Sequence, residues 1–148
     1  MDGDGLMWYK PFEDRFLTGH FGKIRDFRKA VPHRGTDWAP GLGRLIPAIA
    51  SGTVVTIKFE KGLGWIVETR VTDSKNKVWY ITYCHAQAEP KKLKVGDAVV
   101  GGKTHVAKVG NTGTLTTGPH LHATLSKIKG GYKAGLTHDI YKKILSEQ

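Results

Sequence analysis

Short apolar runs separated by turn-forming residues fill the stretch between residues 47 and 125, and they favour a β-rich fold. The clearest runs are Ser51 to Phe59, Gly64 to Val71 and Lys77 to His85. Segments 61–64 (Lys-Gly-Leu-Gly) and 73–76 (Asp-Ser-Lys-Asn) have the turn chemistry to join these runs as antiparallel hairpins. The chain has 19 glycines, and glycine supplies the positive φ angles that tight hairpins require. We therefore expect a meander of three strands.

More strands and a terminal helix are expected after the meander. Segments 104–109 and 119–126 predict strands on either side of a glycine-rich loop, 110–118. Residues 137–148 predict a short amphipathic helix, because apolar side chains recur there at helical spacing: Ile140, Tyr141, Ile144 and Leu145. Together these elements predict a mainly β protein, in which an antiparallel sheet folds into a sandwich or half-barrel.

The region before the sheet, from Trp8 to Gly43, shows no clear periodicity. Glycine and proline interrupt it repeatedly, so we expect loops that wrap the sheet. A length of 148 residues suits one domain that can bury a real core. We therefore expect a single domain over 1–148, with its core in 16–126 and the short helix 137–148 at its end.

An excess of positive charge indicates an anionic partner. The formal net charge is +10, and the basic residues form three clusters: Lys23, Arg25, Arg28 and Lys29; Lys91, Lys92 and Lys94; and Lys127, Lys129 and Lys133. Charge alone does not choose between nucleic acid, the phosphate-rich wall of a bacterium, and lysines that only keep the protein soluble. No patterned pair of aromatic strands accompanies the charge, so nucleic-acid binding is not expected.

The sequence carries no recognisable segment that directs a chain into or across a membrane. Residues 1–11 lack the apolar centre of a secretory signal, and no run approaches the roughly 20 apolar residues of a membrane span. We therefore expect neither a signal peptide nor membrane insertion. The single cysteine, Cys84, excludes an intramolecular disulfide.

Two spaced pairs of metal-binding residues carry the chemistry. His120 and His122 lie two apart in a predicted strand, so both imidazoles point to the same face. His33 and Asp37, four apart, also share a face in an extended segment, and Gly35 between them leaves room for an ion or a close neighbour. A helical pair is the rival geometry, but this glycine and the prolines on both sides of the segment disfavour a helix.

Imidazole nitrogens and carboxylate oxygens are zinc ligands, and a catalytic zinc site takes three protein ligands and leaves a fourth position for water. His85, at the end of a predicted strand, adds a fifth candidate group, so two histidines can act on protons. The alternative is that the histidines only line a polar cleft. Tyr83 should share the face of His85, and it either lines the substrate groove or packs in the core. Cys84 should point to the opposite face and lie in the core.

Three motifs together carry a family resemblance. They are His33-x-x-x-Asp37, Tyr83-x-His85, and Thr117-Gly118-Pro119-His120-Leu121-His122. They resemble the lysostaphin-type peptidases, also called the LytM or M23 metallopeptidase family, and the similarity runs from about Phe16 to Ser126. It includes the turn at 95–99 and the loop at 109–113.

The resemblance implies that His33, Asp37 and His122 hold one zinc ion per chain, and that His85 and His120 are the catalytic histidines. The chain departs from the usual pattern in the residues that follow His85 and His122, which are Ala86-Gln87 and Ala123-Thr124-Leu125. These departures concern substrate preference and leave the metal ligands intact.

The resemblance further implies a zinc endopeptidase that hydrolyses the stem peptide or cross-bridge of bacterial peptidoglycan and so lyses the cell wall. The basic surface fits a monomer drawn to anionic wall polymers. Without a signal peptide, we expect a bacteriophage lysin, released from the host cytoplasm at lysis or carried on the virion, and the competing interpretation is the excised domain of a bacterial enzyme.

Two other functions have less support from the sequence. A non-catalytic domain that binds the wall or a partner is the main alternative, but such relatives typically lack metal ligands and this chain lacks none. Zinc peptidases of the D-alanyl-D-alanine type centre on a Glu-x-x-His pattern, which does not occur in this sequence.

Overall fold

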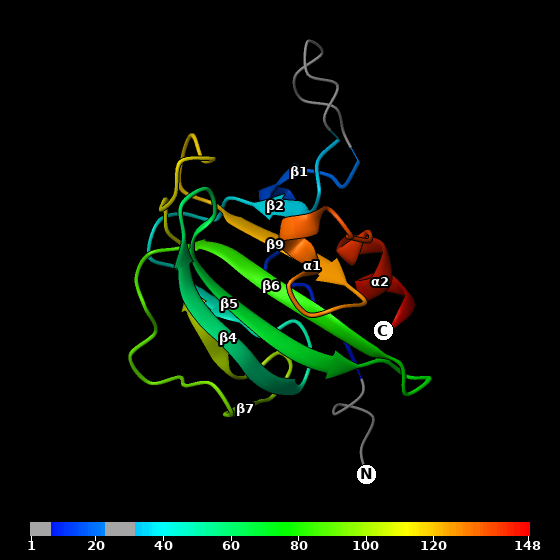
Figure 1. Ribbon diagram of the computed structural model, residues 1–148. Helices are drawn as coiled ribbons and strands as arrows, with labels where there is room; N and C mark the ends of the chain where they lie inside the picture. The colour runs from blue at the N-terminus through cyan, green and yellow to red at the C-terminus, as the bar shows by residue number, and fades with distance from the viewer. Residues whose placement is uncertain (1–6, 23–31) are drawn as a thin grey trace.

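The computed structural model describes residues 7–22 and 32–148, and within these ranges the main element is a seven-stranded antiparallel sheet (Figure 1). In sheet order its strands are β1 (Leu17–Gly19), β2 (Thr36–Trp38), β9 (Leu121–Ser126), β6 (Val78–Ala86), β5 (Gly64–Thr72), β4 (Gly52–Glu60) and β7 (Ala98–Val99). The predicted mainly β, antiparallel fold is confirmed. The predicted basic cluster from Lys23 to Lys29 lies outside the described residues.

The three central strands form the predicted meander. The β4–β5 hairpin closes at the pair Glu60 and Gly64, and Gly64 has a φ of 70°. The β5–β6 hairpin closes beyond Thr72 and Val78, where the carboxylate of Asp73 accepts hydrogen bonds from the turn's backbone. Both hairpins are therefore built by the turn residues that predicted them.

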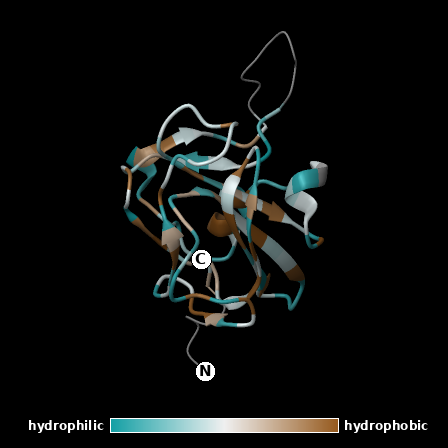
Figure 2. Cartoon of the chain, turned by 60° about the vertical axis from the view of Figure 1, so that its left-hand side comes forward, coloured by the Kyte–Doolittle hydropathy of each residue, from teal (hydrophilic) through white to brown (hydrophobic). Residues whose placement is uncertain are grey.

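A second, two-stranded sheet covers one face of the large sheet. It pairs β3 (Leu45–Pro47) with β8 (His105–Lys108). Apolar side chains of both sheets form the main core, among them Ile46 and Val106 of the small sheet and Val67 and Ile81 of the large one. Figure 2 shows the hydrophobic stretches that lie along these strands.

Two short helices, α1 (Gly131–Ala134) and α2 (Ile140–Ser146), follow β9 and contact it (Figure 1), and the 3-10 turn η2 (Asp14–Phe16) precedes β1. The predicted terminal helix is thus confirmed as α2, and its N-cap residue, Asp139, accepts the backbone N–H of Lys142 with its side chain. Ile140 and Ile144 are fully buried in the core, whereas Leu145 is 47% exposed. None of the helices in the described ranges is long and apolar enough to cross a membrane.

The region from Trp8 to Gly43 is not only loops, so that prediction was wrong in part. Its described residues include β1 and β2, which extend the large sheet beyond β9. Strands of three residues are too short to show alternation in the sequence, and here pairing with a partner strand defines them. This extension determines the geometry of the site, because β2 carries Asp37.

Candidate metal centre

The pairing of β2 with β9 places an acid opposite a histidine. Asp37 and His122 are register partners, and Oδ1 of Asp37 lies 2.8 Å from Nδ1 of His122. The chain just before β2 can approach β9 because residue 35 is glycine. A Cβ atom at Gly35 would overlap the carbonyl oxygen of Ala123 and would lie 2.9 Å from Cε1 of His122. The close approach expected at Gly35 is therefore present, and the neighbours are His122 and Ala123 of β9.

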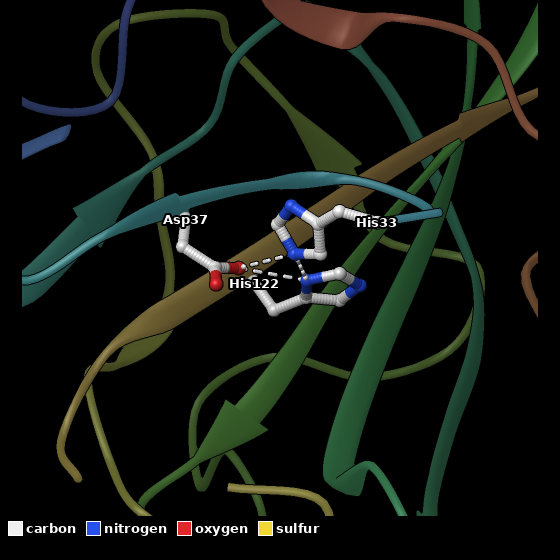
Figure 3. A group of neighbouring side chains, drawn as sticks. All are labelled: His33, Asp37 and His122. Carbon is white, nitrogen blue, oxygen red and sulfur yellow. Dashed lines mark hydrogen bonds and ion pairs between the residues drawn. The ribbon is translucent and has the colours of Figure 1, made fainter. Parts of the chain in front are cut away.

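His33 completes the group from the segment that leads into β2 (Figure 3). Its Nε2 lies 3.2 Å from Nδ1 of His122 and 3.3 Å from Oδ1 of Asp37. Its other ring nitrogen, Nδ1, lies 3.0 Å from the backbone carbonyl oxygen of His20. A carbonyl oxygen can only accept, so Nδ1 carries the proton and Nε2 presents a lone pair to the group.

The donor set fits a tetrahedral zinc ion. The three facing atoms are 2.8–3.3 Å apart, and ligands about 2.0–2.2 Å from a tetrahedral zinc lie about 3.3–3.6 Å from one another. The three side chains are between 4% and 11% exposed, so the group is nearly closed to bulk water. The structure thus brings together the three residues that the family resemblance implies as zinc ligands.

Burial and hydrogen bonding set the charges of this group. Burial opposes ionisation of Asp37, but hydrogen bonds with His122 and His33 hold the pKa of its carboxyl well below its usual range. Burial lowers the pKa of His122. Asp37 therefore provides an ionised carboxylate and His122 a neutral imidazole, the protonation states in which these side chains bind a metal.

Two more histidines face the same centre. Nε2 of His120 lies 3.8 Å from Oδ1 of Asp37, and the ring of His85 lies 4.8 Å from that of His120 and 6.1 Å from that of His122, between ring centres. Burial lowers the pKa of His85 to about 4, so this imidazole is neutral at pH 7. The five residues that the resemblance implies as zinc ligands or catalytic histidines therefore lie together.

The neighbours of His85 differ from the expectation, because alternation breaks at this residue. His85 has a φ of +61°, and the register between β5 and β6 shifts beside it from Trp65–Ala86 to Val67–Tyr83. Such a bulge places two residues opposite one and re-aims a side chain. Strict alternation along β6 therefore gave the wrong faces for Tyr83 and Cys84.

Cys84 is the register partner of His122, on the face of the sheet that carries the candidate centre, and it is buried there beside Ile66 and Tyr132. Its burial was predicted, but the opposite face was wrong. Tyr83 is fully buried in the main core, where its hydroxyl accepts the backbone N–H of Ile49 at 2.8 Å. The interpretation of Tyr83 as a groove residue was therefore wrong, and the alternative, a core tyrosine, is what the structure shows.

Two threonines that the sequence did not single out contact this centre. Thr112 and Thr116 lie in the glycine-rich loop between β8 and β9, and their polar atoms lie near His85 and His120. The only sequence signal was the presence of the 109–113 loop among the matched motifs, which gave no residue a function.

Comparison with known proteins places this fold, with its candidate metal centre, in the class of peptidases. Residues 31–134 match the family described as Peptidase family M23. The chain belongs to this family.

Curated relatives are longer than this chain. An uncharacterized metalloprotease of Buchnera aphidicola is 34% identical over 110 residues, which are 73% of this chain and 26% of that protein. Peptidoglycan DD-endopeptidase ShyB of Vibrio cholerae is 32% identical over 94 residues, 64% of this chain and 20% of that protein. The chain therefore spans about a fifth to a quarter of the curated relatives it matches.

Solved structures share the fold over most of this chain. LytU matches with a TM-score of 0.74 and 29% identity, over 94% of this chain and 90% of that one. The catalytic domain of the prophage-encoded M23 protein EnpA of Enterococcus faecalis, in the form of a mutant, matches with a TM-score of 0.68 and 29% identity, over 93% and 95%. A zinc-containing peptidase of Vibrio cholerae matches with a TM-score of 0.64 and 28% identity, over 78% and 35%.

Proposed function

We propose that this chain is a zinc-dependent endopeptidase that hydrolyses peptide bonds in bacterial peptidoglycan. The observation that carries the proposal is the convergence of Nε2 of His33, Oδ1 of Asp37 and Nδ1 of His122 within 3.3 Å, with two further imidazoles beside them. Membership of a peptidase family and similarity to a zinc-containing peptidase support it.

In this proposal the three ligands hold one zinc ion, and His85 and His120 handle protons. A zinc ion with three protein ligands lowers the pKa of a bound water to about 7 and polarises a carbonyl group. His85 is neutral at pH 7 and can accept a proton. Nε2 of His120 lies 3.8 Å from Oδ1 of Asp37 and this side chain is 16% exposed, so it can contact a substrate carbonyl or a departing amine.

Peptidoglycan is proposed as the substrate because a relative at 32% identity is named as a peptidoglycan endopeptidase. The net charge of +10 suits a protein that also binds anionic wall polymers. The likeness to a prophage-encoded M23 protein over nearly the whole chain supports a bacteriophage lysin that acts on the wall of its host.

Digestion of purified peptidoglycan from several bacteria tests the proposal. New free amines without new reducing sugar ends, lost with a chelator and restored by zinc, are the expected result. His122→Ala should abolish both release and zinc binding. The matched control is His105→Ala, an exposed histidine of β8 outside the group, which should retain both. Activity that survives in the His122→Ala protein would contradict the proposal.

A further inference from the structure

The segment that connects β8 to β9 supplies backbone hydrogen-bond partners for His85 and His120, the two implied catalytic histidines. Nδ1 of His85 lies 2.7 Å from the carbonyl oxygen of Thr112, and Nδ1 of His120 lies 2.8 Å from that of Gly118. Because these oxygens can only accept, each ring carries its proton on Nδ1. Both rings therefore have their lone pair on Nε2, the nitrogen through which His120 faces Asp37.

His85 depends on this support more than an ordinary strand residue does. Its φ of +61° is uncommon for a residue with a side chain and costs about 1–2 kcal/mol. Such a conformation persists only where the surroundings impose it. Two contacts do so here: the backbone N–H of His85 donates to the carbonyl oxygen of Leu63 at 2.7 Å, and the ring bonds to Thr112.

Thr112 is itself fixed by its side chain. Its hydroxyl donates to the carbonyl oxygen of Ala86 at 2.6 Å and accepts the backbone N–H of Trp65 at 3.1 Å. Ala86 follows His85 in the chain, and Trp65 is the register partner of Ala86. The hydroxyl of Thr112 therefore ties the loop to the bulge that re-aims His85.

Two glycines allow this close contact between the loop and the β4–β5 turn. A Cβ atom at Gly64 would overlap Thr112, and one at Gly113 would overlap the backbone of Gly62 and Gly64. Both glycines also have positive φ angles. The contact is therefore built into the backbone on both sides, and the threonine hydroxyl completes it.

We propose that Thr112 is a positioning residue that selects the tautomer and the orientation of His85, and so keeps the lone pair of this ring on Nε2. The hydroxyl fixes the peptide whose carbonyl oxygen takes the proton of Nδ1. The effect on turnover rests on the proposed peptidase function, whereas the tautomer of His85 does not.

The test compares Thr112→Val, which has nearly the same shape without the hydroxyl, with Thr112→Ser, which keeps it. The matched control is Thr69→Val, because Thr69 is fully buried and its hydroxyl donates to the carbonyl oxygen of Ile81 in the main sheet, outside the loop. Long-range ¹H–¹⁵N NMR of the zinc-loaded proteins reports which ring nitrogen of His85 carries the proton. Zinc content and kcat and KM on a soluble peptidoglycan fragment are measured beside it.

In the wild type and in the serine and control variants, we expect the proton on Nδ1 of His85. In Thr112→Val we expect a mixture of tautomers and a kcat about 10- to 100-fold lower, with zinc content and KM near the wild type. Thr112→Ser should keep most of the wild-type kcat.

Three results would overturn the proposal: a wild-type His85 protonated on Nε2, a valine variant that keeps a single Nδ1–H tautomer, or a serine variant no more active than valine. The wild-type spectrum is a test even if the valine variant does not fold. If the wild type cleaves no wall, the proposed function fails while the tautomer measurement still decides this inference.

Discussion

Replacing Asp73 with asparagine should destabilise the fold strongly without touching the candidate centre. Oδ1 of Asp73 accepts the backbone N–H groups of Lys75 and Lys77, both at 2.9 Å, and the amide oxygen of asparagine can keep these bonds. Oδ2 accepts Nε1–H of Trp79 at 2.9 Å and the ammonium group of Lys143 at 3.0 Å. In the variant an NH₂ group would face these two donors.

The expected loss follows from these two contacts. A hydrogen bond to a charged group contributes about 1.5–3 kcal/mol, and breaking a buried ion pair costs about 3–5 kcal/mol. Asp73 is 2% exposed, but the side chain of Lys143 is 20% exposed and can reach water, so each of the two lost contacts takes the lower hydrogen-bond value of about 1.5 kcal/mol. We expect a loss of about 3 kcal/mol in the free energy of unfolding. The midpoint of thermal unfolding should fall by about 6–12 °C.

The lowered pKa of Asp73 predicts how the stability difference between wild type and variant changes with pH. Burial opposes ionisation of Asp73, but hydrogen bonds from Trp79, the turn backbone and Lys143 hold its pKa well below the usual range. The stabilisation is therefore fully present above the unfolded pKa of about 3.9, and it is lost as the pH falls towards the lower folded pKa. The difference between wild type and variant should shrink below about pH 4.

Urea unfolding at pH 7 and at several acidic pH values measures both quantities. The control is Asp97→Asn, at an exposed turn where the carboxylate accepts the backbone N–H of Lys94 at 2.9 Å, and it should change stability by less than about 0.5 kcal/mol. A loss below about 1 kcal/mol for the Asp73 variant at pH 7, or a difference that grows in acid, would refute the reasoning.

Two further variants test the packing around the centre. Gly35→Ala should push β2 from β9, because the new Cβ would overlap the carbonyl oxygen of Ala123. We expect elemental analysis to give a zinc content well below one per chain. A variant with full zinc content and wild-type stability would contradict the close packing. Tyr132→Ala should uncover Cys84, which is 1% exposed and whose thiol has a pKa raised by burial. The wild-type thiol should resist a thiol reagent in the folded state, and equal reaction rates in both proteins would show that Tyr132 does not cover it.

The parts of the fold that the sequence predicted are those with a local signal. Strands β4, β5 and β6 are long enough to show apolar runs, and their turns carry glycine or a capping aspartate. The short strands β1 and β2 have no such signal, since they exist through pairing with β9. The sequence of one segment alone does not indicate which distant segment it pairs with.

The candidate centre likewise has features that the sequence predicted and features that it did not. Alternation and the glycine at position 35 predicted that the two pairs His33–Asp37 and His120–His122 would each face one way, and the structure brings them together. The orientation of His85 was not predictable from alternation, because it depends on a left-handed residue in a bulge and on Thr112, 27 residues later. The same bulge explains why the faces of Tyr83 and Cys84 were misassigned.

X-ray absorption at the zinc edge of the purified protein tests the central claim most directly. We predict one zinc per chain with nitrogen and oxygen neighbours at about 2.0–2.2 Å and no sulfur neighbour at about 2.3 Å. We also predict that this signal disappears in His122→Ala. A sulfur shell would make Cys84 a ligand and contradict the donor set of His33, Asp37 and His122, and a protein that binds no zinc at all would contradict the proposed zinc-dependent activity.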